Sequence, residues 1–571
     1  MGGTANRLEG VKRMKTNQTA LTKSQWWKSA VIYQIYPRSF ADSNADGYGD
    51  LPGIISKLDY LQDLGIDAIW LCPVFKSPQD DNGYDVADYL DIDPMFGSMS
   101  DMKKLIKEAE KRQIRIILDL VLNHSSDEHA WFVEAKKSRE NPYHDYYIWR
   151  EKPTNHWDSP FSDSAWEWEE AVGEYYLHQF SVKQPDLNWE NERMRQDLYG
   201  MINRWVELGI GGFRLDVIDL LGKEPDHNIK VNGKHLHTYI REMSAACFGQ
   251  ADLVTVGEAW SANTQNAALY SSPDGSELSM VFQFEHILLD QEEEGEKWDM
   301  KPLSLVKLKQ VIKRWHTELE GKGWNSQFWE NHDLPRIVSR WGNDKEYRAE
   351  SGKMLAMLLM GLQGTPYIYQ GQELGMTNIS LKADEYTDIE TRVMFEKRGR
   401  LGFSPEEMLR SAHARSRDNA RTPMQWDDSK HAGFTTGEPW MQVNPNYMQI
   451  NAKNQMEDPN SVRSFYKALI QIRKKHEVFI TGQFELLIPE DETLFAYVRS
   501  NEKEEILVLC HFYGGTVVNP LLSKTANMKL ILSNYETVTD GVENTSNEKE
   551  IQEQGSNILR PYEARMYVKT L

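Results

Sequence analysis

Eight short apolar runs, most of them separated by helical patterns, constrain the fold of this 571-residue chain more than any other feature. The runs are rich in β-branched and aromatic residues, whereas intervening segments such as 102–112 and 354–362 show helical spacing. Near-continuous apolar strands that alternate with helices are typical of a parallel sheet covered by helices. The sequence therefore predicts an α/β protein built on a closed (β/α)8 TIM barrel, with strands in residues 31–37, 68–74, 115–122, 211–219, 253–260, 279–285, 325–333 and 365–372.

Two parts of the chain depart from this alternation. Residues 125–190 are longer than a strand-to-helix loop requires and are rich in Trp, Tyr, His and Pro, which predicts an inserted domain B at the barrel rim. After an amphipathic helix at 461–476, strands without long helices predict a C-terminal antiparallel β-sandwich. The expected domains are a loose N-terminal extension in 1–25, a barrel in 26–124 and 191–480, domain B in 125–190, and domain C in 481–571.

The composition argues against several classes of protein. A formal net charge of −21 disfavours nucleic acid or an anionic membrane as the main partner. No apolar run approaches the ~20 residues that span a bilayer, and residues 1–25 lack the apolar core of a secretory signal. The three cysteines, Cys72, Cys247 and Cys510, show no metal-binding spacing. Cys72 and Cys510 lie in apolar strand-like runs, so we expect buried thiols in a reducing cytoplasm.

The fourth predicted strand, 211–219, carries a charged pair. Apolar Phe213 and Leu215 alternate with Arg214 and Asp216, so the two charged side chains project to the same face. Arg214 can then hold Asp216 ionised and lower the pKa of its carboxyl. An isolated pair of this kind is more often a structural ion pair at a strand end. Only further carboxylates at neighbouring strand ends change that interpretation.

The carboxyl ends of the predicted strands do carry such groups, where the catalytic residues of a TIM barrel sit. They are Asp119, Asn123, His124, Arg214, Asp216, Glu258, His332 and Asp333. Cleavage of an acetal needs two carboxyl groups of unequal pKa, one ionised and one protonated. Asp216, beside Arg214, is the candidate for the ionised group, and Glu258, with apolar sequence neighbours, is the candidate acid. No nucleophile elbow, P-loop or dinucleotide fingerprint competes with this interpretation.

Four segments resemble the signature regions of the alpha-amylase family, glycoside hydrolase family 13: Asp119-Leu-Val-Leu-Asn-His124, Gly212-Phe-Arg-Leu-Asp216, Val256-Gly-Glu258 and Glu330-Asn-His-Asp333. Gln184-Pro-Asp-Leu-Asn188 resembles the fifth region in the form that marks the oligo-1,6-glucosidase branch. Residues 80–85 and 417–426 are also typical of that branch, and 257–260 and 279–286 are similar to its glucan 1,6-alpha-glucosidases, or dextran glucosidases. The resemblance extends from about Trp26 to the C-terminus and implies a barrel, domain B and a C-terminal β-domain.

The resemblance implies a retaining double displacement through a covalent glucosyl-enzyme. Asp216 would be the nucleophile and Glu258 the acid and then the base, with their carboxyl groups roughly 5–5.5 Å apart. Asp333 would bind the 2- and 3-hydroxyls of the sugar and stabilise the transition state. The remaining residues implied at the glucose are Tyr84 stacked under the ring, His124 and His332 at its hydroxyls, Phe180 among the substrate contacts, and Arg214 orienting the nucleophile.

The same resemblance bears on which bond is cut. Asp81 and Arg417 would pair and close the pocket beyond the glucose 4-hydroxyl, which makes the enzyme exo-acting. Val217 follows the nucleophile and resembles the α-1,6-specific members of the branch, since a bulky side chain there could exclude an α-1,4-linked aglycone by shape. The subsite implied on the reducing side consists of Trp260, Lys297 and Glu390.

Three alternatives stay open. Residues 392–400 are basic where sucrose isomerases carry an Arg-rich loop, although Lys397-Arg-Gly-Arg-Leu401 lacks the alternating Arg/Asp form, so isomerase activity is the runner-up. The glucosyl-enzyme could also pass its sugar to a sugar acceptor instead of water. A non-catalytic relative, such as the heavy chain of an amino-acid transporter, is disfavoured because the three acids are present and no membrane anchor is found. We therefore expect a cytoplasmic, monomeric glycosidase that acts on isomaltooligosaccharides or dextran.

The segment Asp42-Ser-Asn-Ala-Asp-Gly-Tyr-Gly-Asp50 predicts a structural calcium site. Gly47 at its sixth position permits the sharp turn of a calcium loop. A position-12 Glu and the second helix of an EF-hand are missing, so a plain Asn/Asp/Gly turn is the alternative. The branch that the chain resembles has calcium in the first βα loop, which favours the ion. The expected ligands are the side chains of Asp42, Asn44, Asp46 and Asp50 and the backbone carbonyl of Tyr48.

Overall fold

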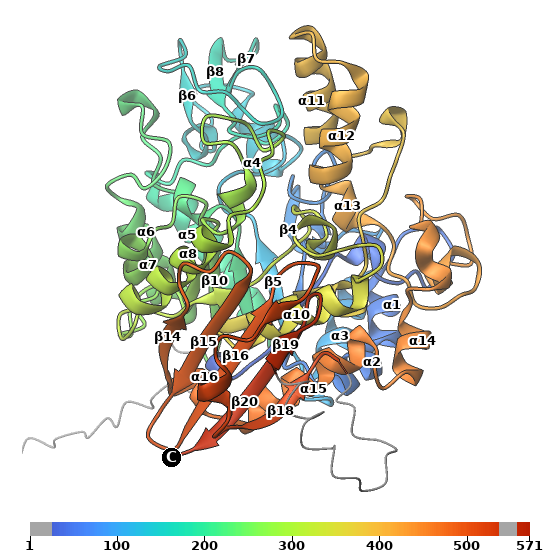
Figure 1. Ribbon diagram of the computed structural model, residues 1–571. Helices are drawn as coiled ribbons and strands as arrows, with labels where there is room; N and C mark the ends of the chain where they lie inside the picture. Colours follow the sequence, from blue (N-terminus) through green and yellow to red (C-terminus); the bar gives the residue numbers. More distant parts are fainter. Residues whose placement is uncertain (1–24, 250, 536–556) are drawn as a thin grey trace, which may run out of the picture.

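The computed structural model describes residues 25–249, 251–535 and 557–571. Its centre is an eight-stranded parallel sheet in the order β11-β10-β9-β5-β2-β1-β13-β12 (Figure 1). A parallel bridge between Val281 and Asn325 joins the two outer strands and closes the predicted barrel. The strands are β1 (Ile32–Ile35), β2 (Ala68–Leu71), β5 (Arg115–Leu120), β9 (Gly212–Leu215), β10 (Val254–Glu258), β11 (Met280–Phe282), β12 (Ser326–Gln327) and β13 (Thr365–Tyr369).

All eight strands are shorter than the predicted runs, and two of them end early at residues of the site. The predicted strand 211–219 ends at Leu215, because Val217 adopts a left-handed backbone conformation and the chain enters a short 3-10 helix, Ile218–Leu220. The predicted strand 325–333 forms a strand only at Ser326–Gln327, preceded by the bridge residue Asn325, and residues 328–333 form a loop. In both cases the residues that leave the strand carry the polar groups at the end of the barrel.

Helices cover the outside of the barrel. α3 (Met99–Glu110) begins before the predicted residue 102, because Ser98 and Asp101 form a capping box at its N-terminus. α10 (Arg348–Met360) is buried along most of its length, and Ser461 caps α15 (Val462–Lys475). The short sheet of β3 (Phe75–Lys76) and β4 (Asp88–Ile92) follows β2. The other helices of this part are α1 (Leu51–Ser56), α2 (Leu58–Leu64), α5 (Glu192–Glu207), α6 (Leu236–Met243), α7 (Thr264–Tyr270), α8 (Leu305–Glu318), α9 (Ile337–Arg340), α13 (Asp418–Arg421), α14 (Ala452–Glu457) and α16 (Val478–Thr481).

The residues between β5 and α5 form a small unit at one end of the barrel (Figure 1). Phe132 of its helix stacks on Trp149 at 5.6 Å between ring centroids, so aromatic residues supply its core. An antiparallel bridge between His124 and Asp186 returns the chain to the carboxyl end of β5. The unit contains α4 (Ala130–Ala135) and a three-stranded antiparallel sheet of β6 (Trp149–Arg150), β8 (Glu174–Leu177) and β7 (Trp166–Glu169).

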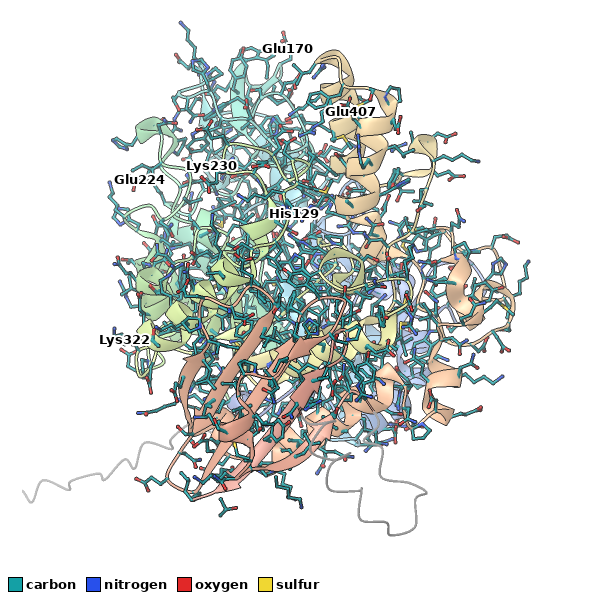
Figure 2. All side chains as sticks on the ribbon, in the orientation of Figure 1. His129, Glu170, Glu224, Lys230, Lys322 and Glu407 are labelled. Carbon is teal, nitrogen blue, oxygen red and sulfur yellow. The ribbon has the colours of Figure 1, made fainter. Side chains whose placement is uncertain are left out.

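A pair of helices that the sequence did not reveal, α11 (Ile389–Arg400) and α12 (Pro405–Arg415), stands beside this inserted unit (Figure 1). Glu407 of α12 and Glu170 of the insert mark the two neighbouring tips in Figure 2. Arg400 Nη2 lies 3.2 Å from Asp163 of the insert, and Lys397 Nζ donates to the carbonyl oxygen of Ser162 at 3.4 Å. These contacts join the helical pair to the insert.

The C-terminal residues form an antiparallel sheet in the order β14-β15-β16-β20-β18, in agreement with the antiparallel domain expected. One face packs on the barrel core through residues such as Tyr497 and Val508. The other face packs against Val517 and Leu559 of a two-stranded ladder. In the described residues the sandwich is therefore unequal, with one full sheet and a narrow cover. The elements are β14 (Gln483–Leu487), β15 (Leu494–Ser500), β16 (Glu504–His511), β18 (Lys529–Ser533), β20 (Ala564–Thr570), the ladder of β17 (Val517–Val518) and β19 (Ile558–Leu559), and α17 (Leu522–Thr525).

Three predictions concern membrane-spanning helices, the cysteines and the N-terminal extension. Within residues 25–249, 251–535 and 557–571, no helix has both the length and the apolar character needed to cross a bilayer. Cys72, Cys247 and Cys510 are buried free thiols, as expected. The predicted extension 1–25 lies outside the described residues except for its last residue.

Candidate active site

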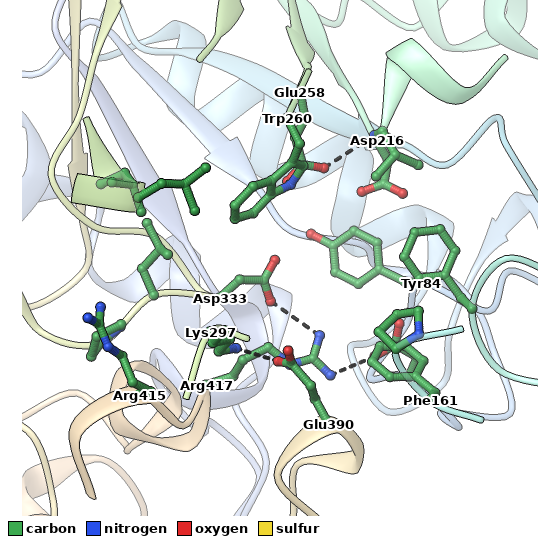
Figure 3. Close-up of a pocket in the computed structure, with 18 of the residues that line it drawn as sticks. Tyr84, Phe161, Asp216, Glu258, Trp260, Lys297, Asp333, Glu390, Arg415 and Arg417 are labelled. Carbon is green, nitrogen blue, oxygen red and sulfur yellow. Dashed lines mark hydrogen bonds and ion pairs between the residues drawn. The ribbon is translucent and has the colours of Figure 1, made fainter. Parts of the chain in front are cut away.

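Most of the side chains predicted to form a site meet in one cavity of about 270 Å³ (Figure 3). Arg214 and His332 lie behind its wall, with side chains 1% and 0% exposed. The predicted residues that line the cavity are Asp81, Tyr84, His124, Phe180, Asp216, Val217, Glu258, Trp260, Lys297, Asp333, Glu390 and Arg417. The fold therefore gathers segments that are far apart in the sequence.

Asp216 lies in the first turn after β9. The first residue of this strand, Gly212, must be a glycine, because a Cβ there would lie 2.2 Å from the carbonyl oxygen of Val254 on β10. Arg214 stays within the strand, whereas Asp216 follows its last residue. Val217 then turns the chain with φ 35°, a conformation that is strained for a β-branched residue. The turn places Asp216 and Val217 on the cavity wall.

Arg214 contacts three carboxylates. Its Nη1 lies 2.8 Å from Asp119 and 2.7 Å from Asp216, and its Nη2 lies 2.6 Å from Glu258. The resemblance implied that Arg214 orients Asp216, and this guanidinium also contacts Glu258 and Asp119. Three buried carboxylates around one cation leave an excess of negative charge, so the cluster favours uptake of a proton.

Arg214 acts on the pKa of Asp216 in the expected direction, but the expected net result, an ionised carboxyl with a lowered pKa, is wrong. Burial raises the pKa of Asp216 well above its ordinary value; Arg214 opposes this effect, and Glu258 and Asp119 add to it. Burial also raises the pKa of Asp119 to about 6, against the opposing effect of Arg214. Desolvation and the neighbouring carboxylates outweigh one shared arginine. The cluster is therefore arranged to hold a proton, which a site that works with one acid and one base requires.

Glu258 lies in a more polar setting than its sequence neighbours suggested. Its Oε2 accepts a hydrogen bond from the backbone N–H of Val217 at 3.2 Å, and its Oε1 accepts one from Trp260 Nε1 at 3.1 Å. The ion pair with Arg214 is a third polar contact. The prediction of an apolar setting is therefore wrong, although the carboxyl is almost fully buried. These contacts fix its orientation beside Asp216 (Figure 3).

Asp333, the third acid, is held in its ionised form. Its Oδ1 lies 2.8 Å from Arg421 Nη2 and 3.4 Å from Arg417 Nη1, and its Oδ2 lies 3.1 Å from His332 Nε2. Burial raises the pKa of this carboxyl, but His332, Arg417 and Arg421 together hold it well below the usual range. A fixed carboxylate of this kind is a strong acceptor for sugar hydroxyls.

Tyr84 and His332 stack on each other, with ring centroids 5.3 Å apart and 6° between the planes. Tyr84 Oη lies 2.6 Å from His332 Nε2 and 3.0 Å from Asp119 Oδ2. His124 lies 5.1 Å from the ring of Phe180. Burial lowers the pKa of His124 to about 4 and that of His332 to about 3. Both imidazoles are therefore neutral at pH 7, each with one donor and one acceptor nitrogen.

The pair of Asp81 and Arg417 that the resemblance implied is present, with 3.2 Å between Oδ1 and Nη2. Gln184 Nε2 donates to the other oxygen of Asp81 at 3.2 Å, and Arg417 Nε donates to Asp388 at 2.7 Å. Burial raises the pKa of Asp81 to about 7, against the effect of Arg417. The pair links the loop between β3 and β4 to the residue that precedes α13, across the cavity wall.

Lys297, Glu390 and Trp260 lie together in the cavity as the resemblance implied. Lys297 and Glu390 form an ion pair (Figure 3). Trp260 stacks on Phe284 with ring centroids 3.8 Å apart and remains 42% exposed. A half-exposed indole beside paired polar groups is suited to contact with a sugar ring. Glu390 reaches the cavity because it lies in the first turn of α11.

The sequence analysis did not name several further residues of the site. Phe161 of the insert lines the cavity and packs against the guanidinium of Arg417, 5.2 Å from the ring centroid, and its loop shows no periodicity that could have revealed it. Arg421 lies behind the cavity wall and contacts Asp333. It could have been found, because it follows Arg417 by one helical turn. The other unanticipated lining residues are Pro160, Ile287, Leu288, Gln291, Leu334, Pro335, Arg340 and Arg415.

The predicted calcium loop has the tight turn expected of it, with Gly47 at φ 92°. Asp42 accepts backbone N–H groups within the loop, and Asp50 caps α1 by accepting from Gly53 N–H at 2.6 Å. Within the described ranges, no group of three or more His, Cys, Asp or Glu side chains is arranged to hold a metal ion. Among those residues Asp42, Asp46 and Asp50 also form no ion pair. The oxygen donors thus fit calcium in chemistry, although the three carboxylates do not converge.

A barrel with an inserted unit, and three acids gathered at its end, defines a TIM-barrel glycoside hydrolase. A family model described as "Alpha amylase, catalytic domain" matches residues 34–482. The chain therefore belongs to the alpha-amylase family, glycoside hydrolase family 13, which confirms the resemblance read from its motifs.

Curated relatives and solved structures agree with this assignment. An oligo-1,6-glucosidase of Halalkalibacterium halodurans is 50% identical over 567 residues, which cover 95% of this chain and 99% of the relative. A glucan 1,6-alpha-glucosidase of Streptococcus pneumoniae is 54% identical over 520 residues, 89% of this chain and 97% of the relative. The trehalose-6-phosphate hydrolase of Bacillus licheniformis is 42% identical with a TM-score of 0.88, covering 95% and 99% of the two chains. The isomaltulose synthase of a Klebsiella species is 38% identical with a TM-score of 0.89, covering 96% and 100%.

Proposed function

We propose that the protein is an exo-acting, retaining α-glucosidase that hydrolyses α-1,6-glucosidic bonds at the non-reducing end of isomaltooligosaccharides or dextran. The proposal depends on one observation: the guanidinium of Arg214 forms ion pairs with both Asp216 and Glu258. Two carboxylates bound to one guanidinium cannot lie far apart. This arrangement favours the ~5–5.5 Å separation of retaining enzymes over the ~6.5–9.5 Å of inverting ones.

The reaction gives each of the three acids a separate role. Asp216, once ionised, attacks C1 of the glucose, while Glu258 donates a proton to the leaving glycosidic oxygen. Glu258 then takes a proton from water, which attacks C1 and releases glucose with its original anomeric configuration. Arg214 remains between the two carboxylates throughout and compensates the charge that each carries in turn. Asp333 binds the sugar hydroxyls as a permanent carboxylate, because two arginines and His332 stabilise its charge.

Cleavage from the chain end follows from the Asp81–Arg417 pair. Its two side chains, 3.2 Å apart, form part of the cavity wall together with Phe161 and close the cavity on this side. A second sugar beyond the glucose 4-hydroxyl would have to break a buried ion pair, which is costly. The α-1,6 preference rests on Val217, whose side chain lines the cavity beside Asp216, and agrees with the names of the two curated relatives.

Hydrolysis is favoured over the sucrose isomerisation suggested by the basic residues 392–400. Lys397 and Arg400 contact Ser162 and Asp163 of the insert. The residues that line the cavity from α11 include Glu390 but neither of these two basic residues. The basic segment therefore serves the contact between α11 and the insert.

Product analysis on isomaltose, isomaltotriose, dextran, maltose and sucrose tests the proposal. We expect α-glucose as the first product from the isomaltose series, weak release from maltose, and no isomerised disaccharide from sucrose. Release of β-glucose would contradict retention, and isomaltulose from sucrose would favour the isomerase. Transfer products at low sugar concentration would favour a transferase.

We further propose that calcium binds the loop of Asp42, Asn44, Asp46, Tyr48 and Asp50 as a structural ion. The carboxylates of Asp42, Asp46 and Asp50 have no ion-pair partner among the described residues, which supports this proposal. Burial raises the pKa of Asp50 and Asp42 adds to that rise, so a cation between these two carboxylates would stabilise their charges. The ion would brace the loop that leads into α1. Chelation is expected to lower the melting temperature and calcium to restore it, whereas an unchanged melting temperature would contradict a bound ion.

We also propose that the enzyme works as a monomer in the cytoplasm. Support for a reducing compartment comes from its three cysteines, which are buried and unpaired as disulfides. Light scattering of the purified chain tests the monomer, and fractionation of the source cells tests the compartment.

A further inference from the structure

The cavity extends beyond Lys297 and Trp260 to a second set of charged groups. Arg415, at the end of α12, and Arg340, at the end of α9, line it together with apolar Leu288. In Figure 3, Arg415 lies at the opposite end of the drawn residues from Asp216. The glucose-binding acids and these arginines therefore occupy different ends of one cavity.

The two guanidiniums share a single carboxylate. Asp290 lies 2.6 Å from Arg340 Nη2 and 2.9 Å from Arg415 Nη2, and Arg340 Nε donates to its other oxygen at 2.8 Å. All three side chains are almost completely buried, between 5% and 7% exposed. Among the described residues, Asp290 is the one carboxylate paired with either arginine. This end of the cavity thus carries one uncompensated positive charge.

The hydrogen-bonding groups show the same imbalance. Arg340 Nη1 is buried and has no hydrogen-bond partner in the described structure. Burial and the nearby Arg340 lower the pKa of Arg415, and Asp290 only partly opposes this effect. Arg340 alone satisfies both oxygens of the Asp290 carboxylate. Arg415 Nη2 also donates to the backbone carbonyl oxygen of Asp290 at 2.8 Å, so it braces the turn Ile287–Asp290 without bringing a second negative charge to it. The positive charge of one guanidinium and the N–H groups of Arg340 Nη1 remain uncompensated.

Other charges near this end do not remove the imbalance. Lys297 is neutralised by Glu390, so it adds no net charge. The acidic residues 292–294 follow the cavity residue Gln291 but are exposed, and water screens them. A buried, uncompensated cation is stabilised more by an anion than by a neutral hydroxyl.

From these observations we propose that Arg415 and Arg340 form an anion subsite, so that the enzyme prefers α-1,6-glucosides whose aglycone carries a carboxylate or phosphate. The inference rests on the proposed cleavage of α-1,6-glucosides. The reaction is the same hydrolysis: water supplies OH to C1 of glucose and H to the glycosidic oxygen, and the anionic aglycone leaves unchanged.

The test compares acids with their matched neutral alcohols at fixed ionic strength. The substrates are glucosyl-α-1,6-gluconate against isomaltitol, and the corresponding pair with one more glucose, so that two distances from the cleaved bond are sampled. We expect kcat/KM to be about tenfold higher for the acid in at least one pair, as for a charge-assisted contact. In Arg415→Gln this ratio should fall to about one, whereas Arg415→Lys should keep part of it and Arg410→Gln, an exposed control on α12, should keep all of it.

Equal kcat/KM for acid and alcohol in both wild-type pairs would overturn the proposal, without any variant. If inorganic phosphate inhibits the enzyme while kcat/KM is the same for acid and alcohol, the proposal is also overturned, because the arginines would then bind a free oxyanion and not the aglycone of the substrate. An acid preference that persists in a folded Arg415→Gln would overturn the assignment to Arg415. Failure to hydrolyse isomaltose or isomaltitol would instead contradict the proposed α-1,6 activity itself.

Discussion

The backbone N–H of Val217 donates a hydrogen bond of 3.2 Å to the side-chain carboxylate of Glu258. The two residues belong to neighbouring strand ends, and the contact forms because Val217 turns the chain with φ 35° directly after Asp216. The residue after the nucleophile thus holds the acid through its backbone and faces the cavity with its side chain. Changes of its side chain can therefore alter specificity without removing the contact to the acid.

Val217→Ala should raise the ratio of α-1,4 to α-1,6 cleavage, about tenfold for a few methyl groups in a pocket. Alanine relieves the strain of a β-branched residue at positive φ, so the melting temperature should not fall. The measurement is kcat/KM on maltose and on isomaltose. Val217→Ile, which keeps the bulk, is the matched control and should leave the ratio unchanged. An unchanged ratio in Val217→Ala would refute the argument from shape.

Glu258→Gln should lower kcat on isomaltose by about 10²–10⁴-fold, because the leaving oxygen loses its proton donor. The loss should be much smaller on 4-nitrophenyl α-glucoside, whose leaving group needs little protonation. The amide oxygen can still accept one of the two hydrogen bonds, from Val217 N–H or from Trp260 Nε1, and the side chain keeps its size, so the fold should be retained. Equal losses on the two substrates would argue against the role of general acid.

Asp216→Asn should abolish turnover, with kcat lower by at least about 10⁴-fold on both of those substrates, because no glucosyl-enzyme can form. The melting temperature should stay the same or rise, since one of three mutually repelling carboxylates is removed. Mass spectrometry with a slow fluorinated glucoside should label the wild-type chain at Asp216 and leave the variant unlabelled. Label on another residue would sink the assignment.

The barrel and its principal acids were predictable from the sequence because both depend on short-range patterns. The eight strands are apolar over several consecutive residues, and the residues that follow them, such as Asp216 and Glu258, must meet once the barrel closes. Even the Asp81–Arg417 pair could be anticipated, although only through the family resemblance.

Other features could not be predicted because they depend on tertiary contacts. The pair of α11 and α12 is stabilised partly by contacts with the insert, such as Arg400 with Asp163, which leave no periodic signal in either segment. Local sequence likewise gave the wrong setting for Glu258, since the guanidinium of Arg214 reaches it from the neighbouring strand and the indole N–H of Trp260 turns back towards it. The pKa of Asp216 was misjudged because burial and neighbouring acids are not visible along one strand.

The acid limb of the pH profile tests this charge cluster directly. Asp216 must be deprotonated to attack, and its raised pKa means that activity is lost as the pH falls, at a higher pH than for an ordinary carboxyl. Asp119 contributes to that rise and competes for Arg214. In Asp119→Asn, the acid limb of kcat/KM on isomaltose should therefore move to lower pH. Asp59→Asn, an exposed control with the same change in net charge, should leave the limb in place. A shift to higher pH in Asp119→Asn would mean that loss of its contacts with Tyr84 and Arg214 matters more than its charge.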